Sequence, residues 1–208
     1  MAPTEYGKFA EVYDLLMRDV PYTAWARYLQ ELFAQFGVLP GQRVLDCACG
    51  TGEFAIRLHQ AGYVVTGLDR SEEMLAVAQK KARKAGAKIP FVLQDMRYLA
   101  LHQPVFAINC ACDGVNYLLE DEDVRSFFMS ANRALQENGV LLFDISSAYK
   151  LEQVLGNRTY GEDTKAITYL WQNCFDPDSR LLEMKLAFFL PQANELYERF
   201  DERHVQAA

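Results

Sequence analysis

The chain has 208 residues, half of them apolar and a quarter charged, so it is long enough for one domain and too apolar for a disordered protein. Its net charge of −7 argues against a broad basic surface for nucleic acid or anionic membrane. No window approaches the roughly 18 apolar residues of a membrane span, and the first residues lack a signal peptide's apolar stretch. We therefore expect no nucleic-acid or membrane partner and, by default, a cytoplasmic location.

Two N-terminal helices are predicted first, over residues 5–17 and 22–36, the second between Pro21 and Gly37. Short apolar strands then alternate with helices, which is typical of a parallel sheet covered on both faces. Ser71 and Gly86 are the expected first and last boundaries of one of these helices. The predicted strands are 43–46, 63–68, 91–93, 105–108 and 140–145, and the intervening helices include 53–61, 72–85 and 121–137.

Beyond residue 156 the pattern changes to apolar and mixed runs over 167–175, 181–190 and 196–205. The first two runs flank a turn sequence at 176–180. The third run places alternate residues on one side, including Phe200, Glu202 and His204. This pattern predicts three antiparallel strands.

A glycine-rich turn follows the first predicted strand, in the segment Asp46-Cys47-Ala48-Cys49-Gly50-Thr51-Gly52. Its small residues let the backbone approach a ligand, and the next helix offers free N–H groups. Asp69 ends the second strand, where a carboxylate can accept hydrogen bonds from ribose hydroxyls. After the third strand, Asp95 could accept from an adenine amino group and Met96 could cover the ring.

The same glycines also fit the dinucleotide fingerprint, which is a weak pattern by itself. Two features argue against a nicotinamide cofactor. Asp46 would bring negative charge to a pyrophosphate, and Asp95-Met96 supplies an adenine site that the fingerprint does not require. An acidic first turn suits S-adenosylmethionine, which has an ammonium and a sulfonium there and no phosphate.

Four motifs in order over residues 44–145 resemble those of class I S-adenosylmethionine-dependent methyltransferases. The segments that flank them narrow the resemblance to a bacterial small-molecule branch that is similar to the amino-sugar N-methyltransferases. The resemblance covers nearly the whole chain. It depends on 46–52, 67–75, 94–96 and 138–144 for the core motifs, and on 6–17, 21–25 and 112–118 for the flanks.

The resemblance implies a Rossmann-like sheet, S-adenosylmethionine as cofactor and S-adenosylhomocysteine as product. It also implies an N-terminal helical lid over residues 1–37, a cofactor-binding core over 38–156 and an antiparallel insert over 157–208, all in one methyltransferase domain. Residues that would bind the methionine part, the ribose, the adenine or the lid side of the cofactor are Tyr13, Tyr22, Asp46, Ala48, Cys49, Gly50, Gly52, Asp69, Arg70, Asp95, Met96 and Cys112.

The chain departs from the family at its end, where the last two strands of the usual sheet are missing from the predicted elements. The fifth strand would then be an apolar edge, which is a pairing hazard. We therefore expect self-association, as in a homodimer. The main prediction is transfer of a methyl group to N or O of a small molecule. Because of the missing strands, one alternative is a protein that binds the cofactor without catalysis. A less favoured alternative is a nicotinamide-dependent oxidoreductase.

Three residues are candidates for the chemistry. Tyr13 could contribute cation–π attraction to the sulfonium, or could be a core aromatic of an amphipathic helix. Asp113 could take a proton from the acceptor, or could stabilise the turn at Gly114. His204 could do the same, or could lie exposed near the terminus. Further candidates for taking the acceptor's proton are Asn116, Tyr117 and Glu202. Aromatic residues that could line an acceptor pocket, or could simply pack in the sheet, are Trp171, Phe188, Phe189, Tyr197 and Phe200.

Four of the five cysteines form two Cys-x-Cys pairs, Cys47/Cys49 and Cys110/Cys112. If the first and fourth strands are neighbours, as is usual for this fold, the pairs lie close together. Four sulfurs could hold zinc, although structural zinc sites usually have wider spacing within a pair. Cysteine also serves as a small apolar residue where packing is tight, so we predict no metal.

Overall fold

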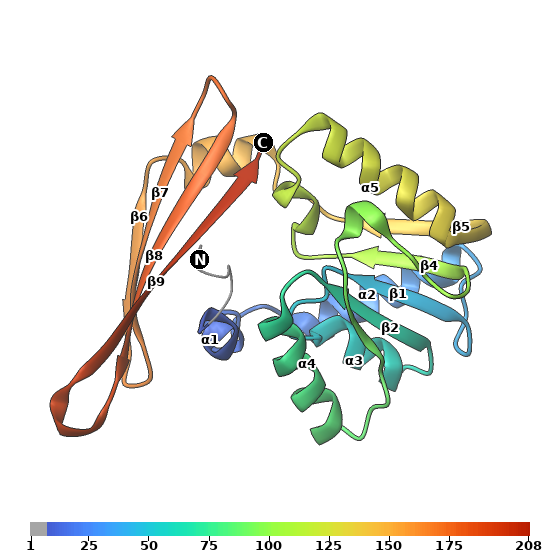
Figure 1. Ribbon diagram of the computed structural model, residues 1–208, viewed down its shortest axis with the longest axis horizontal. Helices are drawn as coiled ribbons and strands as arrows, with labels where there is room; N and C mark the ends of the chain where they lie inside the picture. The colour runs from blue at the N-terminus through green and yellow to red at the C-terminus, as the bar shows by residue number, and fades with distance from the viewer. Residues whose placement is uncertain (1–7) are drawn as a thin grey trace. The chain divides into compact units, whose positions relative to one another are not determined.

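The computed structural model describes residues 8–208, which divide into two compact units (Figure 1). The parallel-sheet unit comprises residues 8–115 and 120–144. The antiparallel-sheet unit comprises residues 116–119 and 145–208. Residues 5–7 of the first predicted helix, and Tyr6 of the first flanking motif, lie outside the described residues.

The parallel-sheet unit contains five strands in the order β3-β2-β1-β4-β5, and all neighbouring pairs are parallel. This order confirms that the first and fourth strands are neighbours, and β3 and β5 are the edges among the described residues. Because neighbouring strands run parallel, the carboxyl ends of β1, β2 and β4 lie at the same end of the sheet. The strands are β1 (Arg43–Cys47), β2 (Val64–Asp69), β3 (Phe91–Leu93), β4 (Val105–Cys110) and β5 (Leu135–Phe143).

Helices cover both faces of this sheet, because parallel crossovers are right-handed and β2 and β5 lie on opposite sides of β1. On one face, Phe33 and Leu58 pack against Val44 of β1 in a buried apolar cluster. No helix among the described residues is long and apolar enough to cross a membrane. The helices are α1 (Phe9–Leu16), α2 (Tyr22–Gln35), α3 (Glu53–Gln60), α4 (Glu72–Lys84) and α5 (Asp121–Ala134), with short 3-10 turns η1 (Met96–Tyr98) and η2 (Gly114–Tyr117).

The sequence predicted these elements in the right order, and the Ser71 cap is confirmed by a 3.1 Å hydrogen bond from the Met74 N–H to Ser71 Oγ. The boundary between α5 and β5 was wrong. The helix ends at Ala134 and the strand begins at Leu135, whose backbone is extended and pairs with Val105 of β4. Pairing with a distant strand overrides the local helical pattern of residues 135–137.

The antiparallel-sheet unit has four strands in the order β6-β7-β8-β9, where the sequence predicted three. The additional strand is short and polar and contains Gly161, so its sequence lacks the usual apolar alternation. The turn predicted at 176–180 joins β7 to β8, as expected. The elements are a π-helical segment η3 (Lys150–Leu155), β6 (Thr159–Asp163), β7 (Thr168–Asp176), β8 (Leu181–Pro191), the turn η4 (Ala193–Glu195) and β9 (Tyr197–Ala207).

One face of the antiparallel sheet is buried. Leu182 and Met184 of β8 lie opposite Gln206 and His204 of β9, and all four are buried. Phe188 stacks on Phe200 with 4.9 Å between ring centroids. Both aromatics were predicted as candidates for an acceptor pocket; Phe188 is fully buried in this packing, and Phe200 is half-buried.

Gly67 of β2 is required by close packing against Phe91. A Cβ added at Gly67 would lie 2.5 Å from the Phe91 ring, which itself packs against two buried clusters. We expect Gly67→Ala to lower the free energy of unfolding by about 1–3 kcal/mol, measured by urea denaturation. With the smaller leucine at position 91, the same Gly67→Ala change should cost less stability, so the double variant should lie closer to Phe91→Leu than Gly67→Ala lies to the native protein. An equal loss in both backgrounds would contradict the steric explanation.

Candidate functional site

The glycine-rich turn follows β1 at the end of the sheet where the parallel strands have their carboxyl ends. Ligands of open α/β sheets bind at this end. Gly50 and Gly52 have φ of 52° and 80°, and Ala48 has φ of 54° without being glycine. Cys112, which follows the neighbouring strand β4, also has a left-handed φ of 63°. Strained non-glycine residues of this kind cluster at functional sites, and here they occur in two adjacent loops.

Asp69 joins the glycine-rich turn to the end of β2. Its Oδ2 accepts a 2.8 Å hydrogen bond from the Gly50 N–H, and its Oδ1 accepts a 2.9 Å bond from the Ser71 N–H. Burial raises the pKa of Asp69 above its ordinary value, against the opposing effect of these donors. The carboxylate is thus fixed in orientation beside the turn and keeps further lone pairs for a ligand's hydroxyls.

Asp46 at the end of β1 has a buried oxygen that the protein leaves unsatisfied. Oδ1 accepts a 2.7 Å hydrogen bond from Asn109 of β4, whereas Oδ2 has no hydrogen-bond partner in the described part of the chain. Burial raises the pKa of Asp46 to about 7 against the opposing effect of the Asn109 amide and the Ala55 N–H, and the negative charge of Asp69 adds to the shift. A cationic group beside Oδ2 would satisfy it, so this site fits the ammonium of a methionine moiety.

Tyr13 and Tyr22, from α1 and α2, hydrogen-bond through their side chains. Burial raises the pKa of Tyr22, and negative charge on Cys112 and Glu53 would raise it further, so the hydroxyl stays protonated. The Tyr22 ring also packs edge-on against Phe54, with 5.6 Å between centroids. The structure thus brings together two aromatic residues that the family resemblance assigned to a lid.

Cys112 is a thiol at neutral pH. Burial raises its pKa to about 12, and the carboxylates of Asp144 and Asp113 add to the shift. A protonated, half-buried thiol is a poor nucleophile, so the residue can contribute contact and shape but no covalent chemistry.

Asp95, the predicted adenine partner, forms an ion pair with Arg97. Its carboxylate accepts hydrogen bonds of 3.0 Å from Arg97 Nε and 2.6 Å from Arg97 Nη2, and Arg97 also bonds Asp123 of α5 at 2.8 Å. These hydrogen bonds lower the pKa of Asp95 below its ordinary value. Met96 is half-buried, and Arg70 is exposed and close enough to Asp95 to lower that pKa further.

The candidates for proton transfer fall in both units. Asp113 follows β4 with φ of 52°, and its N–H donates a 3.2 Å hydrogen bond to Asp144 Oδ2. His204 is on β9 in the antiparallel-sheet unit, with its ring edge-on to Tyr117 at 6.0 Å between centroids. Its exposed fraction is 7%, so the alternative of an exposed histidine near the terminus is wrong. The strand's alternation turns His204 to the buried face.

The cysteines are free thiols, and Cys47 and Cys110 on neighbouring strands hydrogen-bond to each other. Within residues 8–208, no three His, Cys, Asp or Glu side chains form a group that could hold a metal ion. The first member of each Cys-x-Cys pair therefore meets the other between neighbouring strands, as the strand order predicted, and both of these thiols are fully buried.

The sequence missed several partners of the site residues. Asn109 is a polar residue in an otherwise apolar strand, which is a pattern that could have marked it as a buried hydrogen-bond partner. Asp14 and Lys81 both bond Thr51 inside the glycine-rich turn. No local pattern could have found that pair, because the two residues are 67 positions apart.

Comparison with known proteins gives a consistent family. Residues 44–139 match a methyltransferase domain model. YqeM of Bacillus subtilis strain 168, a protein classed with the methyltransferases, is 40% identical over 97% of this chain and 79% of its own length.

Solved structures agree. An S-adenosylmethionine-dependent methyltransferase from Clostridium acetobutylicum ATCC 824 matches with a TM-score of 0.86 and 36% identity, over 98% of this chain and 81% of that chain. The sugar N-methyltransferase KedS8 from Streptoalloteichus shares the fold, with a TM-score of 0.78 at 19% identity over 94% of this chain and 78% of that chain.

Fold and site together define a class I methyltransferase with a Rossmann-like sheet and a separate antiparallel sheet. The chain belongs to the S-adenosylmethionine-dependent methyltransferase family, and S-adenosylmethionine is its cofactor. This assignment replaces the nicotinamide alternative, as the acidic first turn predicted.

The raised pKa of Asp46 predicts pH-dependent binding of S-adenosylhomocysteine, which carries the same ammonium. A cation beside Asp46 favours its charged form, so binding releases a proton and the affinity falls as the pH drops through about 7. We expect affinity at pH 6 to be about tenfold weaker than at pH 8, measured by calorimetric titration.

Asp46→Asn is the matched control, because it keeps the oxygen that accepts from Asn109 and removes the titration. Its weaker affinity should not change between pH 6 and pH 8. A native protein with the same affinity at both values would contradict the contact between Asp46 and the ligand's ammonium.

Proposed function

We propose that this enzyme transfers a methyl group to a nitrogen or oxygen of a small molecule, with an amine nitrogen favoured. When bound, S-adenosylmethionine supplies a methyl carbon activated by positive sulfur. The observation that carries the proposal is the hydrogen-bonded pair of Tyr13 and Tyr22 near Cys112, close to the turn that follows β1. The pair offers two aromatic faces and, at Tyr22, a hydroxyl that burial keeps protonated.

Such a site suits catalysis by positioning, because in-line displacement at an activated carbon needs alignment more than proton chemistry. The Tyr13 ring would attract the sulfonium, and the Tyr22 hydroxyl would accept from or donate to the acceptor. Asp113 remains our proposed proton acceptor in the parallel-sheet unit, and His204 the proposed one in the antiparallel-sheet unit. An amine that arrives neutral loses its proton only after the methyl group has moved.

The names of similar proteins support an amine. A glycine/sarcosine N-methyltransferase of Halorhodospira halochloris is 38% identical over 49% of this chain and 39% of its own length. Proteins that share the fold include an amino pentose methyltransferase and a glycopeptide N-methyltransferase. Two of these names specify methylation of nitrogen, and the other names an amino sugar.

Our proposed cofactor contacts place the methionine part at Asp46, Ala48, Cys49, Gly50 and Gly52, the ribose at Asp69 and the adenine at Asp95 and Met96, with Arg70 beside them. Each of these residues lies at the end of a strand or in the loop that follows it. Asp69 is the sharpest test, because its carboxylate is already oriented by two backbone donors.

We expect Asp69→Ala to weaken S-adenosylhomocysteine binding at least tenfold, because hydrogen bonds to a charged group contribute about 1.5–3 kcal/mol. Calorimetric titration would measure the affinity, and circular dichroism would confirm that the variant is folded. Asp178→Ala, in the exposed turn between β7 and β8, is the matched control and should bind as the native protein does. Unchanged affinity in a folded Asp69→Ala would refute the ribose assignment.

The acceptor proposal predicts an effect on turnover from Tyr22→Phe. Against a panel of small amines and their hydroxyl analogues, the native enzyme should form S-adenosylhomocysteine fastest with an amine. Tyr22→Phe should lower kcat with that amine about five- to tenfold, the effect of one hydrogen bond, and leave cofactor affinity within about twofold. Faster turnover with the hydroxyl analogues would favour oxygen, and no turnover with any acceptor would favour the catalytically inactive alternative.

A further inference from the structure

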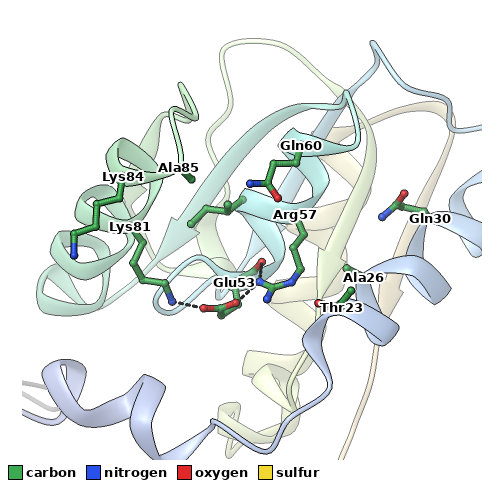
Figure 2. A pocket seen from close by; sticks show the side chains of 10 residues that line it. Thr23, Ala26, Gln30, Glu53, Arg57, Gln60, Lys81, Lys84 and Ala85 are labelled. Atoms are coloured by element: carbon green, nitrogen blue, oxygen red, sulfur yellow. Dashed lines mark hydrogen bonds and ion pairs between the residues drawn. The ribbon is translucent and has the colours of Figure 1, made fainter.

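Four charged side chains form a continuous chain of ion pairs across three helices of the parallel-sheet unit. Lys81 of α4 bonds Asp14 of α1 at 2.6 Å and also bonds Glu53 at the start of α3, which in turn bonds Arg57. Figure 2 shows Glu53 between Lys81 and Arg57. Positive and negative groups alternate along the chain, so every charge has an opposite neighbour.

The same cluster reaches into the glycine-rich turn through Thr51. The Thr51 hydroxyl donates a 2.6 Å hydrogen bond to Asp14 Oδ1 and accepts a 3.1 Å bond from Lys81 Nζ. Thr51 is 1% exposed and lies between Gly50 and Gly52. Asp14 and Lys81 therefore fix α1 to the turn through a buried hydroxyl.

Burial makes this arrangement sensitive to the loss of Lys81. The side chains of Lys81 and Glu53 are 22% and 19% exposed, so water screens them only in part. A groove of about 620 Å³ between α2, α3 and α4 opens beside Glu53, Arg57 and Lys81. Without the ammonium, Glu53 would keep Arg57 as its partner, whereas Asp14 would lose its cation, which would weaken the contact that holds α1 to the turn.

Asp14 directly follows Tyr13, so the same contact sets the position of the tyrosine that bonds Tyr22. We propose that Lys81 is a positioning residue for the cofactor: by holding Asp14 against Thr51, it keeps α1 and Tyr13 beside the glycine-rich turn. Lys81 acts through Asp14 and Thr51 and need not touch the cofactor. The inference rests on the proposed cofactor contacts of Tyr13 and the turn.

The test compares S-adenosylhomocysteine affinity in variants of the full chain by calorimetric titration. Lys81→Met removes the charge and keeps much of the aliphatic stem, and we expect about tenfold weaker binding. Lys80→Met is the matched control on the same helix, because Lys80 is exposed, and it should bind as the native protein does. Lys81→Arg keeps the charge and should stay within about threefold of native affinity.

Hydrogen exchange of the unliganded variants separates positioning from general destabilisation. In Lys81→Met we expect faster exchange for the amides of α1, with the strands of the parallel sheet protected as in the native protein. Asp14→Asn should produce the same local change and a similar loss of affinity, which provides a second route if Lys81→Met does not fold.

Native affinity in a folded Lys81→Met, or a loss of equal size in Lys80→Met, would overturn the proposal. So would weaker binding with unchanged exchange in α1, because the lysine would then act on the cofactor by another route. Failure of the cofactor site itself would appear separately, as unchanged binding in Asp69→Ala.

Discussion

The carboxylate of Asp69 is the constraint on which the rest of the site depends. It ties the Gly50 N–H of the turn after β1 to the Ser71 N–H that precedes α4, and so fixes two loops to one another. The parallel register of β1 and β2 makes this possible, because it places the ends of both strands at the same level. With the turn held, the left-handed backbone of Ala48 and Gly50 stays open for close approach by a ligand.

Electrostatics around this turn differ on its two sides. Toward the sheet, Asp46 is buried with one oxygen unsatisfied and a raised pKa. Its negative charge is therefore destabilised in the unliganded protein, and a cationic ligand would stabilise it. Toward the helices, Asp14, Lys81, Glu53 and Arg57 compensate one another. The first side therefore keeps an unsatisfied carboxylate oxygen, whereas the charges on the second side are paired with one another.

Much of the site could be predicted from the sequence, because its residues follow strands in a fixed order. Asp46, Asp69 and Asp95 each lie at or just after a strand end, and the structure has them there. Partners such as Asn109 and Arg97 could not be assigned, since a hydrogen bond depends on where distant side chains point. The prediction that His204 is exposed was wrong, because the burial of a residue on a strand depends on what covers each face of the sheet.

The sequence by itself determined the order of strands and helices, the Ser71 cap and the glycine-rich turn, because each depends on residues a few positions apart. Only the tertiary structure decided where β5 begins, since Leu135 takes its conformation from pairing with Val105. It alone decided that β6 is a strand, because a short polar segment gains its hydrogen bonds from β7. The contact of Asp14 and Lys81 with Thr51 likewise needed three elements to pack before any of its bonds could form.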